Sequence, residues 1–238
     1  MKKIHPLLPA LAAGSAGYVL RFLLYRNGFD DRGLLNPADP LHILCWILAL
    51  GLSVFLLLRL RKNCDAPIAP VFGTLSAVAA ALLLAFCTWN FVPDAQGTLQ
   101  RVRVALCALA AAAIILSALI QATGRTIHPA LHVPVCLFFP TDMLCRYQNW
   151  SGNPQLADYC FTLGASVCLC LSAYQLVAMP AKLGKRKFHL LFTLLALCLC
   201  LFSLAGPESS PLYLAGAFWA VAALSFVHPG EEAARADS

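Results

Sequence analysis

The chain has 238 residues, of which 60% are hydrophobic and only 12% are charged, and its mean hydropathy is +0.75. This balance excludes an ordinary soluble domain, because too few polar residues remain to cover a water-facing surface. The net charge of +6 suits contact with anionic lipid headgroups, so it does not indicate nucleic acid as a partner. The composition predicts one integral membrane domain over residues 1–238, with the lipid bilayer as its surroundings.

Apolar runs near the length that crosses roughly 30 Å of hydrocarbon recur along the whole chain. They are separated by short stretches rich in Pro, Gly, Asn and charge, which predicts an all-α, polytopic transmembrane helical bundle. The first run allows two interpretations, a cleaved signal peptide after Lys2 and Lys3 or an uncleaved helix, and its continuation to Leu20 and beyond favours the helix. The eight expected spans are residues 4–25, 41–60, 70–92, 102–122, 129–148, 156–179, 188–206 and 211–228.

The basic residues predict how these spans are oriented. If both termini are cytoplasmic (N-in and C-in), most of the 17 Lys and Arg residues fall in cytoplasmic segments, including the clusters at 59–62 and 182–187. Residues 231–238 are then a short cytoplasmic tail. The compact chain and its short loops favour a multi-pass protein of the cell membrane, specifically a bacterial inner membrane.

Two halves of the chain follow a similar plan. Ile4-His5-Pro6 and Ile127-His128-Pro129 each open a span, and a basic cluster follows the next span in both halves, at 59–62 and 185–187. The third span of each half ends in a Pro-acid pair, Pro93-Asp94 or Pro207-Glu208. Such spacing predicts a parallel 4+4 repeat with halves at 1–124 and 125–230. The alternative is that any membrane protein with short loops looks periodic.

The fifth span is unusual because prolines and charges interrupt it. Pro134 and Pro140 each remove a backbone donor, so we expect the helix to be kinked or broken. Thr141 would then accept hydrogen bonds from freed amides and place Asp142 near a new helical N-terminus. Arg146 follows Asp142 by four residues, so the two share a face and are expected to form an ion pair.

The charges at the predicted outer side give the leading hypothesis for a binding site. The pair of Asp142 and Arg146 either lines a ligand pocket or is a boundary pair that only neutralises itself near the headgroups. Gln121, near a span end, is expected to be a hydrated interfacial amide. The residues expected to line an outward-opening pocket for a small polar solute are Asp142, Arg146, Arg21, Asn90 and Asp158.

Metal and cofactor sites are weakly indicated. His128, His132 and Cys136 are spaced i, i+4, i+8 on one helix face, but Pro134 interrupts that face, and only His189 is placed to complete a site. No cofactor and no metal are therefore expected. All but Cys64 of the 11 cysteines lie in apolar spans, where they act as small hydrophobic residues.

The sequence contains no Gly-rich phosphate loop, no His-Glu-x-x-His motif and no Gly-x-Ser-x-Gly motif, which argues against an enzyme. The leading hypothesis is a protein that binds or transports a small polar solute. The alternative is an accessory or scaffold subunit with a membrane-protein partner, favoured by the small residues between Ala105 and Ala113. A weaker alternative is an intramembrane enzyme or metal-binding protein that uses His132, Cys136 and Asp142.

Overall fold

The fold is known from a computed structural model that describes residues 5–27, 39–62, 70–93, 95–125, 127–150, 159–206 and 211–226. Within these ranges all regular structure is helical, which confirms the all-α prediction. A 3-10 turn, η1, precedes the fifth helix. The expected cytoplasmic tail at 231–238 lies outside the described residues. The helices are α1 (Leu7–Asn27), α2 (Pro40–Lys62), α3 (Pro70–Phe91), α4 (Thr98–Ala122), η1 (Pro129–His132), α5 (Val133–Trp150), α6 (Cys160–Ala178), α7 (Arg186–Ser203) and α8 (Pro211–Ser225).

Six of these helices are long and apolar enough to cross a membrane: α1, α2, α3, α4, α6 and α7. Helix α8 is apolar but has only 15 residues. Helix α5 has 18 residues and is not among the six, because Asp142, Arg146 and the polar residues after it lower its hydropathy. The chain is therefore compatible with a membrane protein, and the number of crossings stays a prediction.

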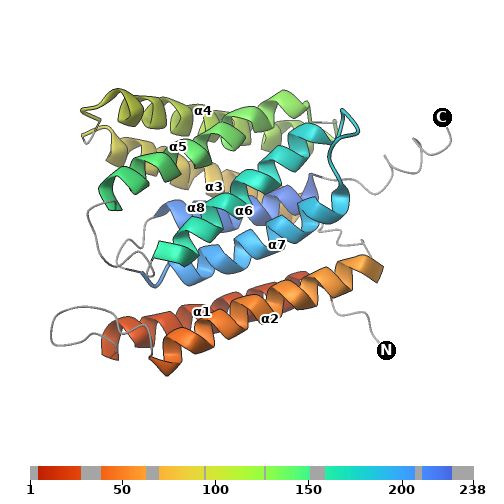
Figure 1. Ribbon diagram of the computed structural model, residues 1–238. Coiled ribbons are helices and arrows are strands. Elements are labelled where there is room, and N and C mark those ends of the chain that lie inside the picture. The colour runs from red at the N-terminus through yellow and green to blue at the C-terminus, as the bar shows by residue number, and fades with distance from the viewer. Residues whose placement is uncertain are drawn as a thin grey trace.

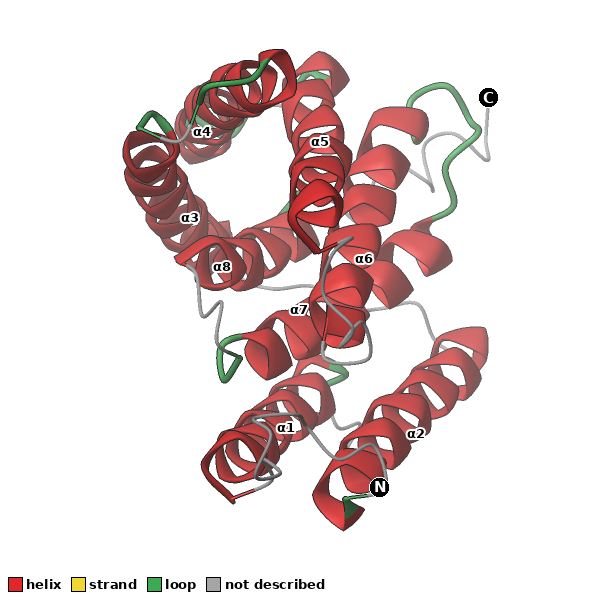
Figure 2. Cartoon of the chain, turned by 60° about the vertical axis from the view of Figure 1, so that its left-hand side comes forward, coloured by secondary structure: helices red, strands yellow, loops and turns green. Residues whose placement is uncertain are grey.

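The helices lie side by side and alternate in direction (Figure 1). Helices α1, α3, α5 and α7 end at the same side of the bundle where α2, α4, α6 and α8 begin. We call this side the arginine end, because Arg21, Arg103 and Arg146 lie there, and the opposite side the histidine end, after His132 and His189. Figure 2 shows α3, α4, α5 and α8 around a ring, with α6 and α7 beside it and α1 and α2 beyond α7.

Helix α7 is the central packing element. It contacts α1, α2, α6 and α8, and a much larger share of its residues is buried than in α2. Helices α3 to α8 share one apolar core that includes Leu84, Phe138, Phe139 and Trp219. A second apolar core joins α1 and α2 to α7. The α1–α2 pair is thus an outer layer that packs on the rest of the described bundle mainly through α7.

The contacts differ between the two sequence halves. Helices α6 and α7 pack along each other, whereas their counterparts α2 and α3 make no comparable contact within the described residues. Helix α3 instead pairs with α4 and α8. The contacts neither require nor exclude an ancestral duplication, so the 4+4 repeat stays a prediction.

The fifth helix, expected to be kinked or broken, is not broken. Helix α5 runs without interruption from Val133 to Trp150 with Pro140 inside it. Pro134 falls in the first turn, where its missing donor has no intrahelical acceptor to lose. The hydroxyl of Thr141 donates to the carbonyl of Leu137 (2.9 Å) and does not cap a new helix. Asp142 therefore lies in a helix interior and not at an N-terminus.

A cysteine pair explains how Pro140 is tolerated. Proline cannot donate to the carbonyl four residues earlier, which here is that of Cys136. The thiol of Cys170 on α6 approaches that carbonyl (Sγ to O, 3.7 Å), and the thiol of Cys136 approaches the carbonyl of Cys170 (4.0 Å). These weak thiol donors partly replace the lost backbone bond and fix α5 against α6.

Candidate functional site

Three charged side chains meet inside the arginine end of the ring. The Nε of Arg146 donates to Oδ2 of Asp142 at 2.7 Å, which confirms the expected i, i+4 contact. The other carboxylate oxygen, Oδ1, lies 3.7 Å from a terminal nitrogen of Arg103 on α4. Asp142 is fully buried, and Arg103 and Arg146 are each 8% exposed. We call these residues the charged trio.

Aromatic rings hold both guanidinium groups. The guanidinium carbon of Arg103 lies 4.0 Å from the centroid of the Phe91 ring on α3, and that of Arg146 lies 5.2 Å from the Tyr213 ring on α8. Such cation–π contacts stabilise a cation that has been removed from water. The charged trio therefore ties together α3, α4, α5 and α8 at one end of the ring.

Burial of three charges is costly unless their interactions compensate for the lost hydration. Asp142 and Arg146 compensate each other through a short charge-assisted hydrogen bond. Arg103 is less well satisfied, because its Nε is buried without a hydrogen-bond partner among the described residues. Asp142 Oδ1 also lacks a hydrogen bond there, since 3.7 Å is too long for one. Within the trio, Asp142 and Arg146 are thus hydrogen-bonded to each other, whereas Arg103 reaches Asp142 only at 3.7 Å.

Arg103 was not among the residues predicted for the site, although its helical position could have indicated it. On α4, Arg103 shares a face with Cys107, Ala110 and Ile114, at spacings of four, seven and eleven residues, and all three are buried. Arg101 lies on the opposite, exposed side of the same turn. An arginine that continues the apolar face of a helix is therefore the signal that sequence reasoning missed.

Arg21 belongs to a different contact set at the same end. It is 2% exposed and donates to the carbonyl of Phe202 (3.3 Å) and to the hydroxyl of Tyr25 (2.6 Å). Its guanidinium also lies over the Phe161 ring at 5.0 Å. Helices α1, α6 and α7 supply these groups, so Arg21 fastens the outer layer to the bundle, and none of these contacts involves the charged trio.

Asn90, another residue predicted for the pocket, is exposed near the end of α3 and does not join the trio. Asp158 lies outside the described residues. Of the four predicted residues that the structure describes, it brings Asp142 and Arg146 together, and it adds Arg103.

Comparison of the chain with protein-family models, with curated proteins and with solved structures finds no match. Function is therefore inferred from the geometry of the chain alone.

The weak metal hypothesis based on His128, His132 and Cys136 is not supported. The 3-10 turn at 129–132 changes the helical phase, so the three residues do not share a face as they would on one α-helix. His128 caps that turn by accepting from the backbone amide of Ala130 (3.3 Å), and the His132 ring packs on that of Phe226. Among the residues that the structure describes, no three His, Cys, Asp or Glu side chains are grouped to hold a metal.

An enzyme that uses His132, Cys136 and Asp142 together is not supported either. His132 and Asp142 are ten residues apart along η1 and α5, which corresponds to roughly 15 Å along a helix axis. The Cys136 thiol contacts the backbone of α6. These three side chains therefore do not converge on one reacting group.

Two buried polar residues at the histidine end, Gln121 and His189, have hydrogen-bond partners within the chain. Gln121, expected at a hydrated interface, is buried, and its amide donates to the hydroxyl (3.0 Å) and the carbonyl (3.3 Å) of Ser225. His189 is fully buried, with Nε2 3.1 Å from the Ala223 carbonyl and Nδ1 3.2 Å from the Ser172 carbonyl and 3.3 Å from the Ser172 hydroxyl. These groups join helices, and their role is structural.

Proposed function

We propose that the protein binds, or moves across a membrane, a small polar solute at the charged trio. The observation that carries this proposal is a fully buried Asp142 between two arginines, with Arg103 incompletely paired. Charges inside an apolar bundle are costly, and those that persist are concentrated along ligand and ion pathways. A purely structural pair would need only Asp142 and Arg146.

We also propose the membrane arrangement that would make this site reachable. The chain crosses the membrane eight times, with both termini in the cytoplasm, and the arginine end faces outward. The basic clusters near the ends of α2 and before α7, at the histidine end, support this orientation. A bacterial inner membrane fits the short connections.

A thermal-unfolding screen tests the proposal. We expect at least one small polar solute to raise the midpoint temperature of the full chain in nonionic detergent, because a ligand that binds only the folded state must stabilise it. At ten times its Kd the rise should be about 3–6 °C for a chain of this size. The screen should include neutral, cationic and anionic solutes. A midpoint unchanged by every class would contradict solute binding.

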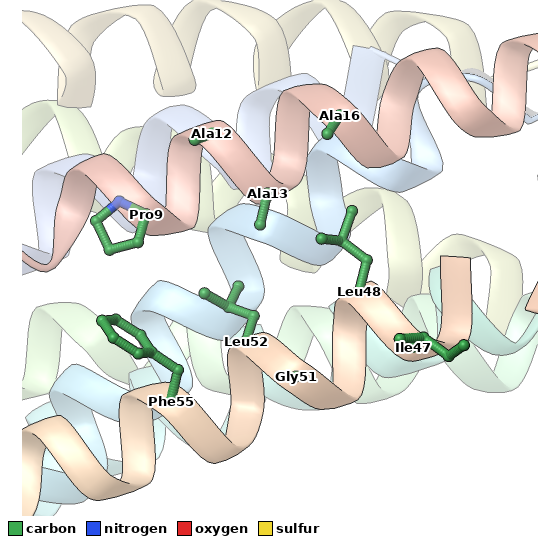
Figure 3. Close-up of a pocket in the computed structure, with 9 residues that line it drawn as sticks. All are labelled: Pro9, Ala12, Ala13, Ala16, Ile47, Leu48, Gly51, Leu52 and Phe55. Atoms are coloured by element: carbon green, nitrogen blue, oxygen red, sulfur yellow. The ribbon is translucent and has the colours of Figure 1, made fainter. Parts of the chain in front are cut away.

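A second candidate function, an accessory subunit of a membrane complex, is favoured by a groove in the outer layer. Helices α1 and α2 border a cavity of about 540 Å³ with an apolar lining (Figure 3). Small residues leave it open, and a Cβ on Gly51 would meet no atom within 4 Å. The residues that line it are Pro9, Ala12, Ala13, Ala16, Ile47, Leu48, Gly51, Leu52 and Phe55.

The alanine-rich part of α4 offers less support for a partner than its sequence indicated. Ala110, Ala111 and Ala113 are buried within the chain's own core, so they already serve packing between α4 and its neighbours. Photo-crosslinkers at Ala16 and at exposed Ala108 on α4 would compare the two surfaces in cells. A discrete adduct from Ala16 alone supports a partner in the groove, and lipid adducts alone from both positions contradict it.

A further inference from the structure

We infer that the ligand of the charged trio is an oxyanion, a carboxylate or a phosphate group, and that Arg103 is its main contact. This inference rests on the proposed function and specifies the chemistry of that same site. It goes beyond the predicted pair of Asp142 and Arg146, because the group with spare donors is neither of them.

The charges within the trio favour an anion. Two guanidinium groups share a single carboxylate, so the three side chains together carry one surplus positive charge in a buried place. A positive charge that is taken from water without full compensation lowers stability, and an anion beside it restores the balance. A cationic ligand would add to the surplus.

Hydrogen bonding identifies Arg103 as the arginine with donors to spare. Arg146 donates to Asp142 at 2.7 Å and makes further contacts. Among the described residues, the carboxylate oxygen paired with Arg103 is Oδ1 of Asp142 at 3.7 Å, beyond hydrogen-bonding distance. A guanidinium has five N–H donors and cannot lose its charge. A buried guanidinium that lacks hydrogen-bond acceptors is therefore stabilised by a ligand that supplies them. An oxyanion supplies two acceptors at once.

The Phe91 ring restricts how a ligand can reach Arg103. The guanidinium carbon lies over the ring, 4.0 Å from its centroid, so the ring blocks approach from that side. The N–H donors point outward in the guanidinium plane, so an oxyanion would bind at the edge of the group. This is the direction in which arginine binds carboxylate and phosphate oxygens in pairs.

The position of Arg103 strengthens the case for a ligand. It is the sixth residue of α4, which begins at Thr98, and it continues the buried face formed by Cys107 and Ala110. A buried cation on an apolar helix face without complete compensation is typical of a functional position.

A comparison of two arginines one turn apart tests this inference. Arg103→Gln removes the buried guanidinium, and Arg101→Gln removes an exposed one whose Nε contacts the carbonyl of Ala95 (3.5 Å). Thermal unfolding would be measured at constant sodium chloride concentration with sodium acetate, acetamide or sodium phosphate. A separate arm adds phosphatidylglycerol or phosphatidylcholine to the micelles, which separates a lipid phosphate from a free anion.

We expect acetate or phosphate, or phosphatidylglycerol alone, to raise the midpoint temperature of the wild type and of Arg101→Gln, with no rise from acetamide or phosphatidylcholine. In Arg103→Gln the apparent affinity for that anion should fall by about 10–100-fold, the effect of losing hydrogen bonds to a charged group. Arg103→Lys keeps the charge but loses the paired geometry, so its affinity should be intermediate.

Other outcomes overturn the inference, and they differ from failure of the proposed function. If only the neutral or cationic solutes of the thermal-unfolding screen stabilise the wild type, the proposal of solute binding stands and the inference of an oxyanion ligand fails. If an anion stabilises wild type and Arg103→Gln equally, Arg103 is not the contact. If no solute and no lipid shifts the wild type, both proposals fail. If Arg103→Gln does not fold, two measurements still test the inference. They are the difference between acetate and acetamide in stabilising the wild type, and the affinity of Arg103→Lys for the anion.

Discussion

Asp142→Asn should lower the free energy of unfolding by about 3–5 kcal/mol, because it leaves Arg146 and Arg103 buried without their shared carboxylate. Asp142 has no exposed surface, so water cannot take over the interactions that the carboxylate makes with the two arginines. The amide can still accept one hydrogen bond from Arg146, but it cannot balance either positive charge. Reversible denaturation of the purified chain in mixed micelles measures this loss.

Asp39→Asn is the matched control. Asp39 Oδ1 accepts from the backbone amide of Leu41 (2.8 Å) at the start of α2, and Asn serves this capping role about as well as Asp. We expect a change of less than about 0.5 kcal/mol. If Asp142→Asn cost no more than this control, the contacts of Asp142 with Arg103 and Arg146 would contribute nothing to stability, which would contradict the prediction.

This expected loss determines which variant can report on ligand binding. An unfolded protein cannot distinguish a lost ligand from a lost fold, so Asp142 is a poor choice for that purpose. Arg103 is a better one, because removing an incompletely paired cation leaves Asp142 and Arg146 bonded to each other at 2.7 Å. Stability and binding are therefore tested at different members of the same trio.

Hydropathy predicted the helices closely because it is a local property. The expected spans at 41–60 and 70–92 agree with α2 (Pro40–Lys62) and α3 (Pro70–Phe91) to within two residues at each end. Prolines at the start of both helices and the apolar run within them depend on no distant contact. The all-α class could thus be predicted from composition and periodicity alone.

The continuity of the fifth helix could not be predicted from its own residues. Pro140 alone predicts a kink or a break, but the thiol of Cys170 from another helix approaches the carbonyl that the proline leaves without a donor. Tertiary contacts of this kind override local preference, and sequence spacing gives no sign of them. The same limit applies to Gln121, whose partner Ser225 is 104 residues away.

Two of the three residues of the charged trio were among those predicted from the sequence. Asp142 and Arg146 could be found because they lie on one helix, four residues apart. Arg103 and Tyr213 reach them from α4 and α8, which only the packing of the ring brings near. Arg21 was grouped with them because it lies at the same end, yet its contacts are with Phe202, Tyr25 and Phe161.

The contact that holds Arg21 in place depends on a glycine one turn earlier. A Cβ added to Gly17 would overlap the ring of Phe202, which is fully buried on α7 and packs against the Phe161 ring at 5.3 Å between centroids. The ring cannot turn away without losing that packing. Helices α1 and α7 approach closely here because Gly17 has no side chain, a common device in membrane bundles.

Gly17→Ala should therefore destabilise the folded chain by about 1–3 kcal/mol, the range for overpacking a filled core. Gly51→Ala should do the opposite, because a Cβ there meets nothing within 4 Å and alanine favours a helix over glycine by about 0.5–1 kcal/mol. Reversible denaturation of both variants in the same micelles compares one methyl group on two helices of the outer layer. Equal effects would mean that backbone preference decides both sites, whereas opposite signs would show that contact between Gly17 and Phe202 fastens α1 to α7.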